Sequence, residues 1–87
     1  MIYRLSSDAI YVEKDNEIVL LHMESGVYFN LRGAILQVFE SLVEGSSLEA
    51  MASKSSAYFA ISKEQATGDM QGVLDRLLAA NLVTQSA

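Results

Sequence analysis

The chain changes its hydrophobic period once, within ESGVYFNLRGAILQVFESL, which runs from Glu24 to Leu42. A turn at Ser25-Gly26 precedes a run of aromatic and branched residues, Val27 to Leu31, that is typical of a strand. Apolar residues then recur at three- and four-residue steps as far as Leu42, which is the spacing of an amphipathic helix. The stretch therefore predicts a strand that leads almost directly into a helix, with strands before it and helices after it.

Two further strands are predicted upstream of this stretch. Ala9 to Val12 and Glu17 to Met23 are rich in branched and aromatic residues, and the polar turn Glu13 to Asn16 separates them. Residues 1–8 carry only a weak alternation and form a strand or an arm. Because Gly26 accepts the positive φ that a tight hairpin needs, the three strands should form an antiparallel meander with Val27 to Leu31 at one edge.

Three helices are predicted downstream. The first spans Arg32 to Glu44 and ends at Gly45, a residue favoured at helix C-termini. The second and third helices begin with capping boxes at Ser46 and Ser62. In a capping box, a hydroxyl and a carboxylate or amide three residues later satisfy free backbone N–H groups. These helices should run to about Tyr58 and Ala80.

The end of the chain should follow a left-handed cap. Asn81 suits the position after the third helix, with Leu82 folding back onto it, and residues 83–87 are expected to form a frayed tail. The sequence thus predicts one α+β domain over residues 1–87: a winged-helix-like fold, with a three-stranded antiparallel sheet followed by three helices.

Composition excludes several classes of protein. Eleven acidic residues against six bases give a net charge of −5, and the bases are scattered singly, so the basic patch of a nucleic-acid or anionic-membrane binder is missing. The chain has no cysteine, and it has no apolar run near the ~20 residues of a membrane span. Without a signal-peptide core either, the protein is expected to be cytoplasmic.

The sequence shows no pattern of catalytic groups. His22 is the single histidine, and without partners at a recognisable spacing it is predicted to be a solvent-facing strand residue. The acid pairs Asp15/Glu17 and Asp69/Asp75 are expected to be solvated, and no phosphate-binding loop occurs. We therefore expect no enzymatic activity, no metal and no cofactor.

Any function should then come from a surface. Successive side chains of a strand point to opposite faces, so Val27, Phe29 and Leu31 should face the core and Tyr28 should be exposed. The other aromatic residues, Phe39, Tyr58 and Phe59, are expected to be mostly core. The third helix has a wide apolar stripe, with Asp69, Val73 and Arg76 beside its core seam. Gly68 and Gly72 lie one turn apart on that helix, either by drift or because a partner backbone approaches closely.

At this point the sequence resembles the PqqD-like family, whose members are also called RiPP recognition elements. The resemblance covers nearly the whole chain from Ile10 to Val83, and it rests on the order and spacing of short apolar motifs rather than on any one of them. The matching residues are Val19-Leu20-Leu21, Gly26-Val27-Tyr28-Phe29-Asn30-Leu31, Ala34-Ile35, Asp69-Met70, Val73-Leu74, Leu77 and Asn81-Leu82-Val83.

The resemblance implies a binding protein for the leader segment of a ribosomally made precursor peptide. The leader would add as a strand beside the third strand, against the third helix, and the domain would deliver it to a leader peptidase and cyclase, as in lasso-peptide pathways, or to another maturation enzyme. An edge strand with unpaired backbone groups is physically suited to this. The implied peptide-binding residues are Val27, Tyr28, Phe29, Asn30, Leu31, Asp69, Gly72, Val73, Arg76 and Leu77.

Two other classes of function remain open from the residues. A winged-helix regulatory or DNA-binding module has a similar order of elements, although the acidic charge disfavours it. A dimerisation module would use the same edge strand to pair with a second copy, giving a homodimer.

Overall fold

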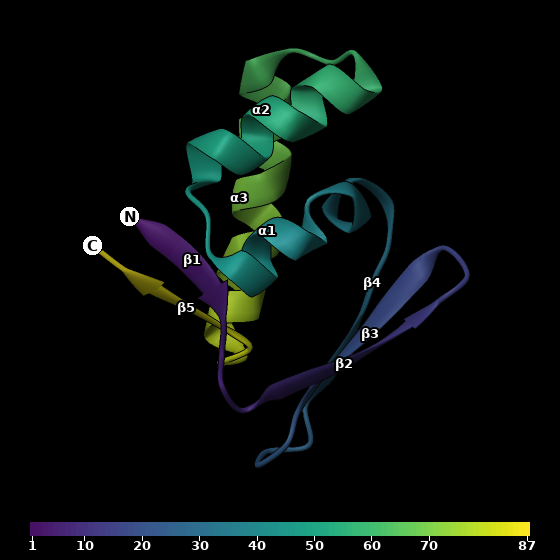
Figure 1. Cartoon of the computed structure of the whole chain (residues 1–87), viewed down its shortest axis with the longest axis vertical. Helices are drawn as coiled ribbons and strands as arrows, with labels where there is room; N and C mark the ends of the chain where they lie inside the picture. The colour runs from purple at the N-terminus through teal and green to yellow at the C-terminus, as the bar shows by residue number, and fades with distance from the viewer.

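The computed structural model describes residues 1–87, and its two sheets lie on either side of the helices (Figure 1). The elements in chain order are β1 Ile2–Leu5, β2 Ala9–Lys14, β3 Glu17–His22, β4 Tyr28–Leu31, the 3-10 helix η1 Gly33–Gln37, α1 Phe39–Glu44, α2 Leu48–Phe59, α3 Lys63–Ala79 and β5 Val83–Ser86. The predicted α+β class, with a three-stranded antiparallel sheet and three α-helices, is confirmed.

The larger sheet is the predicted meander, in the order β2-β3-β4, with both neighbours antiparallel. Its first hairpin turns through Asp15 and Asn16, and Asn16 takes a left-handed φ of 60°, a conformation that asparagine adopts more readily than most residues. In β3 the residues Ile18, Leu20 and His22 are buried, whereas the side chains between them are only half-buried. One face of the sheet therefore covers the core and the other remains partly open to solvent.

The predicted first helix is wrong as a single element. Arg32 is extended, with φ −139° and ψ 162°, and Gly33 then takes a left-handed φ of 78°. A tight 3-10 turn follows, in which the Val38 N–H donates to the Ile35 carbonyl, and α1 begins only at Phe39. Ile35, Val38 and Phe39 are buried together, as their helical spacing predicts, but the left-handed Gly33 and the 3-10 turn replace the first part of the expected α-helix.

The predicted cap of α2 is displaced by one residue. The Ser47 hydroxyl, not that of Ser46, accepts a hydrogen bond from the Ala50 N–H at 3.1 Å. Ser46 instead exchanges two backbone hydrogen bonds with Tyr3, at 2.7 and 2.9 Å, and this bridge holds the first strand against the helices. The cap of α3 is as predicted, since the Ser62 hydroxyl accepts from the Gln65 N–H at 3.1 Å.

The last residues are not a frayed tail. Asn81 takes the predicted left-handed φ of 60°, and the Leu82 N–H folds back to the Leu77 carbonyl at 2.9 Å. The chain then forms β5, which pairs antiparallel with β1 in a second sheet of two strands (Figure 1). Tyr3 and Val83 from these strands are buried in the core, so the pairing is tied to hydrophobic burial.

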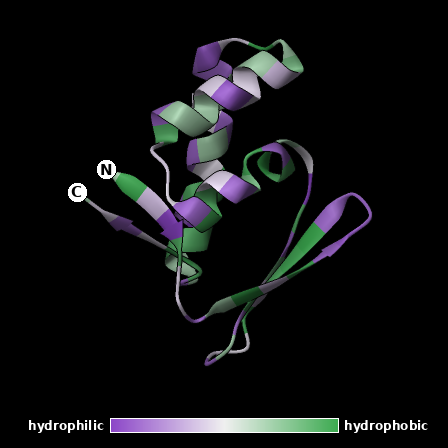
Figure 2. Cartoon of the chain, in the orientation of Figure 1, coloured by the Kyte–Doolittle hydropathy of each residue, from purple (hydrophilic) through white to green (hydrophobic).

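One hydrophobic core joins the two sheets to the helices, and Figure 2 shows the hydrophobic run along β3. Phe39 is buried in this core and meets the Tyr11 ring edge-on, with ring centroids 4.8 Å apart. Tyr58 and Phe59, expected mostly in the core, are instead exposed near the end of α2, where they stack edge-to-face on each other. None of the helices combines the length and apolar character that crossing a bilayer requires.

Replacing Ser55 with alanine should stabilise the domain. Ser55 is fully buried in α2 and its hydroxyl has no hydrogen-bond partner, which is an unfavourable state for a polar atom. Ser55→Ala removes that hydroxyl and raises helix propensity, so we expect the free energy of unfolding to rise by about 1 kcal/mol. Urea unfolding measures it, with the exposed Ser53→Ala as control; equal effects of both changes would assign the gain to propensity alone.

Candidate functional site

The larger sheet has two free edges, because β3 is its middle strand. Successive residues of a strand direct their backbone N–H and C=O groups to opposite neighbours. Two hydrogen bonds next to the β3–β4 turn show which residues of β3 bond which neighbouring strand. The His22 N–H donates to the Val27 carbonyl on the β4 side, and the Met23 N–H donates to the Asp8 carbonyl on the β2 side, both at 2.9 Å. Even-numbered residues of β3 therefore bond β4 and odd-numbered residues bond β2.

The same register identifies the free backbone groups of β4. Leu20 pairs with Phe29 and Ile18 with Leu31, so these are the hydrogen-bonded pairs. Tyr28 and Asn30 lie between them, and their N–H and C=O groups point away from β3 to the open edge. The edge predicted from the sequence thus offers two residues whose backbone can pair with a further strand.

From Tyr28 onwards, the side chains of β4 alternate between the solvent face and the core face, as predicted. Tyr28 is 64% exposed and Asn30 is also exposed, while Phe29 is half-buried and Leu31 is buried. Val27, expected on the core side, is exposed at the turn. Leu31 leads into Arg32, whose guanidinium holds the Glu17 carboxylate of β3 at 2.8 Å and so fixes the end of the strand.

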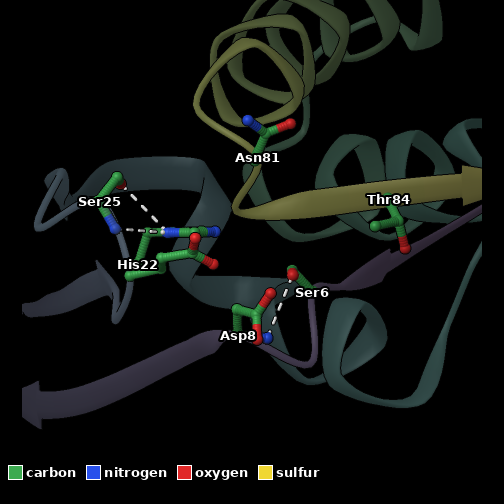
Figure 3. A pocket seen from close by; sticks show the side chains of 7 residues that line it. Ser6, Asp8, His22, Ser25, Asn81 and Thr84 are labelled. Atoms are coloured by element: carbon green, nitrogen blue, oxygen red, sulfur yellow. Dashed lines mark hydrogen bonds between the residues drawn. The ribbon is translucent and has the colours of Figure 1, made fainter.

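A polar pocket of about 610 Å3 opens where the β3–β4 turn faces the end of α3 (Figure 3). Two of its residues come from the segment between β1 and β2, three from the end of β3 and its turn, and two from the chain after α3. They are Ser6, Asp8, His22, Glu24, Ser25, Asn81 and Thr84.

The prediction that His22 faces solvent is wrong, because the residue is only 8% exposed. Its Nδ1 atom accepts a hydrogen bond from the Ser25 N–H at 3.2 Å and lies 3.1 Å from the Ser25 hydroxyl. Both contacts meet the same ring nitrogen, so they build the turn and do not form a nucleophile–base–acid relay. The alternation of β3, in which His22 shares a face with Ile18 and Leu20, was the signal for its burial.

On α3, one flank beside the core seam is open. Asp69, Gly72 and Arg76 are exposed, whereas Thr67, Gln71 and Leu78 on the opposite flank are half-buried. Val73 is half-buried against the core at the border of the open flank, and Leu77, expected in the site, is fully buried. A side chain added at Gly68 or Gly72 would meet nothing, so packing within the chain does not require these glycines.

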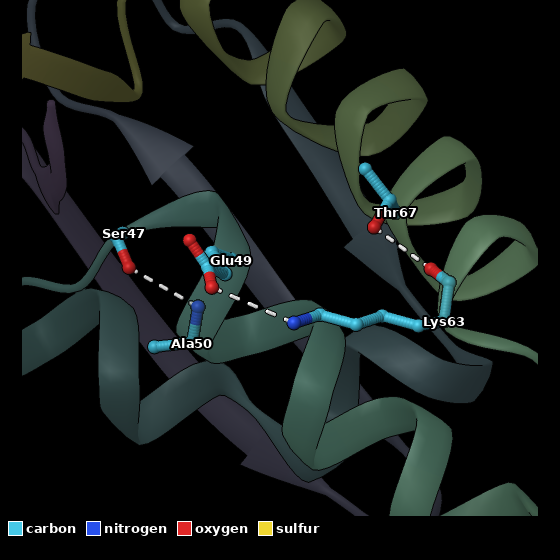
Figure 4. Close-up of polar contacts among 5 residues, drawn as sticks. All are labelled: Ser47, Glu49, Ala50, Lys63 and Thr67. Atoms are coloured by element: carbon cyan, nitrogen blue, oxygen red, sulfur yellow. Dashed lines mark hydrogen bonds and ion pairs between the residues drawn. The ribbon is translucent and has the colours of Figure 1, made fainter.

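One ion pair joins the start of α3 to α2, and one side-chain hydrogen bond lies within the first turns of α3 (Figure 4). The Lys63 ammonium lies 3.5 Å from the Glu49 carboxylate, and the Thr67 hydroxyl donates to the Lys63 carbonyl at 2.8 Å. The ion pair is exposed on both sides and contributes at most about 1 kcal/mol. Packing of Met51, Met70 and Leu74 in the core is the larger reason that α3 keeps its position.

The acid pairs noted in the sequence serve surface contacts in the structure. Glu17 holds Arg32, and the Asp75 carboxylate accepts a hydrogen bond from the Gln71 amide at 2.7 Å. No three histidine, aspartate or glutamate side chains are placed to share a metal ion. The free edge of β4, the open flank of α3 and the polar pocket are therefore the features that a function has to explain.

The sequence profile of the family described as coenzyme PQQ synthesis protein D (PqqD) matches residues 17–83. Because the match covers most of the chain, the protein belongs to the PqqD family, as the motifs had indicated. A search of curated proteins gives no significant match.

Two solved structures have the same fold. One is TbiB1 in complex with the TbiA(beta) leader peptide, which is 25% identical, with a TM-score of 0.86 over 97% of this chain and 98% of that one. The other is a lasso peptide synthetase B1 complexed with the leader peptide, which is 20% identical, with a TM-score of 0.82 over 95% and 98% of the two chains.

Proposed function

We propose that this protein binds the leader segment of a ribosomally synthesised precursor peptide as an additional strand on the free edge of β4. The observation that carries the proposal is the outward-facing backbone of Tyr28 and Asn30, which has no partner within the chain. Main-chain hydrogen bonds give such strand addition its affinity, and pockets for alternate side chains give it specificity. The leader-peptide complex of TbiB1, which shares this fold, supports it.

Some residues of the proposed site contact the peptide, and others support those residues from the core. Tyr28 and Asn30 supply the pairing edge, and the exposed Val27 contacts the peptide beside the turn. The open flank of α3 is the opposite wall, formed by Asp69, Gly72, Val73 and Arg76. Phe29, Leu31 and Leu77 act from beneath, since their side chains belong to the core or lie against it.

The role we propose is presentation rather than catalysis. A leader held along its backbone leaves the remaining precursor free, so a leader peptidase and a cyclase of the lasso type can act on it while the domain holds the leader. Gly72 favours docking of the leader against α3, because the absence of a side chain lets an extended peptide approach the helix closely.

The direct test is calorimetry with the synthetic leader of the cognate precursor peptide. A saturable one-to-one interaction with a negative heat-capacity change is expected, because a docked strand buries apolar surface. A scrambled leader of the same composition is the control. The proposal fails if leader and scrambled peptide bind equally, or if DNA binds with steep salt dependence and the leader does not.

Val73→Glu should weaken leader binding by about tenfold or more, because it places a charge in the apolar border of the α3 flank. Val73 also rests on the core, so a modest loss of stability is expected as well. Ala50→Glu adds the same charge on the exposed surface of α2 and should leave affinity unchanged. Calorimetry on both folded variants decides it, and unchanged affinity for Val73→Glu would remove α3 from the site.

A further inference from the structure

We propose that two copies of this chain associate through the free edge of β2, giving one continuous sheet in the order β4-β3-β2-β2-β3-β4. The inference goes beyond leader binding and does not depend on it. It follows from the free backbone groups of β2, from the exposed apolar side chains along the strand, and from a pairing register that is complementary to itself.

The backbone of β2 is regular and open on one side. β2 pairs with β3 over all 6 of its residues without a bulge. Because odd-numbered residues of β3 bond β2, their partners Ile10 and Val12 direct their backbone groups towards β3. The N–H and C=O groups of Tyr11 and Glu13 therefore face outwards, as does the Ala9 carbonyl. Such an edge is a template for pairing with another strand.

The side chains of β2 lack the protection that edge strands usually have. Ile10, Tyr11 and Val12 are three consecutive large hydrophobic residues, and all three are exposed. Edge strands are commonly guarded by charged residues, proline or a bulge, whereas β2 has its two charged residues only at its end and contains no proline. A partner strand on this edge would remove apolar surface from water.

The backbone restricts how two copies of β2 can pair. Two-fold antiparallel pairing brings outward groups face to face with its axis at residue 10, 11 or 12. An axis at residue 10 needs the Ala9 N–H as a donor, but this group already donates to the Ser6 carbonyl at 3.0 Å. An axis at residue 11 or 12 uses the outward N–H groups of Tyr11 and Glu13 in both copies.

The side chains favour the axis at Tyr11. In that register Ile10 of each copy lies opposite Val12 of the other, and Lys14 lies opposite Asp8 at both ends. Branched apolar pairs and opposite-charge pairs each stabilise adjacent strands. Lys14 and Asp8 are exposed, and neither forms an ion pair within its own chain. With the axis at Val12, Ile10 would instead lie opposite Lys14.

Pairing through β2 leaves the proposed leader site free. β3 separates β2 from β4 in each copy, so the two β4 edges lie at opposite ends of the joined sheet. A dimer of this kind can hold one leader peptide on each copy. Because a single short edge buries little area, the association should be weak and should depend on protein concentration.

Sedimentation velocity on the whole chain, from about 10 μM to about 1 mM, should show a weight-average mass that rises towards two chains. Asp8→Lys and Lys14→Glu each place like charges opposite one another at both ends of the pairing. Each variant should therefore self-associate about tenfold or more weakly than the parent. An equimolar mixture of the two variants restores opposite charges at both ends and should associate about as strongly as the parent.

Glu64→Lys and Lys54→Glu are the matched controls for these charge changes. Both residues are exposed on helices, away from the β2 edge, so each variant alone and their mixture should behave as the parent does. A parent that stays monomeric at the highest concentration overturns the dimer and leaves leader binding standing. A mixture of Asp8→Lys with Lys14→Glu that associates no better than either variant alone also overturns it.

Glu13→Pro tests the backbone of the same edge. The Glu13 N–H faces outwards, so the variant should stay folded, lose self-association and bind the leader as the parent does. Glu13→Ala keeps the donor and should still associate. Unchanged self-association of Glu13→Pro would overturn the β2 dimer alone. Loss of leader binding in folded Glu13→Pro would place the leader on β2 and overturn both proposals.

Discussion

Tyr28→Pro and Asn30→Pro are each expected to weaken leader binding strongly while the domain stays folded. Proline has no N–H, and the register of β4 places the N–H groups of these two residues on the open edge. The peptide carbonyl opposite each would lose its donor on docking, which costs about 1–3 kcal/mol, and the proline ring obstructs the approach. Binding should therefore weaken by about tenfold to a hundredfold for each variant.

The same substitution one residue along should have the opposite outcome. Phe29→Pro removes an N–H that bonds Leu20 of β3 and deletes a side chain packed on the core, so this variant should be unfolded. Circular dichroism reports folding and calorimetry reports leader binding on the folded variants. Tyr28→Ala keeps the N–H and separates the loss of the side chain from the loss of the donor. Normal binding by folded Tyr28→Pro and Asn30→Pro would rule out strand addition at β4.

Phe39→Ala should lower the free energy of unfolding by about 3–5 kcal/mol, the largest effect of a single side chain in this core. Phe39 is 2% exposed, lies between the sheet and the helices, and meets Tyr11 edge-on. The total stability of a domain is only about 5–15 kcal/mol, so the variant should be close to unfolding at room temperature. Urea denaturation followed by circular dichroism measures the difference.

Tyr58→Ala is the matched control for this large aromatic truncation. Tyr58 is 63% exposed on α2 and stacks edge-to-face on Phe59, so its removal should cost about 1 kcal/mol or less. A loss below about 1 kcal/mol for Phe39→Ala would show that Phe39 does not organise the core. Similar losses for both variants would contradict the separation of core and surface aromatics.

Features set by neighbouring residues were predictable from the sequence. The meander followed from alternating strands and from turn residues, the cap at Ser62 from its hydroxyl, and the left-handed Asn81 from its place after a helix. Each depends on interactions within a few residues, so the local pattern contains the information. The PqqD-family assignment followed in the same way, from the order of these elements.

Features set by distant partners were not predictable in this way. Residues 83–87 read as a polar tail, and only the pairing of β5 with β1, at the other end of the chain, makes them a strand. The local sequence predicts a helix cap at Ser46, because the bridge from Ser46 to Tyr3 cannot be seen in it. The hydrophobicity of Tyr58 and Phe59 predicts burial, whereas in α2 both side chains are exposed.

In the candidate site too, some features follow from the sequence and others depend on distant contacts. An edge strand follows from topology alone, so the stretch from Val27 to Leu31 could be selected before any coordinates. The identity of the outward residues needed the pairing of His22 with Val27, which depends on the conformation of the turn. Leu77 shares a helical side with Val73 and could be excluded as a contact only when its burial was known.

The pairing of β1 with β5 has a consequence for attachment. Ile2 lies opposite Ser86, so both ends of the chain leave the domain side by side, on the far side of the helices from β4 (Figure 1). Anything fused to either end is therefore tethered at the same corner and leaves the β4 edge unobstructed. A force applied through both ends would unzip the two strands one bond at a time, beginning at the termini, because the pair is loaded from its open end.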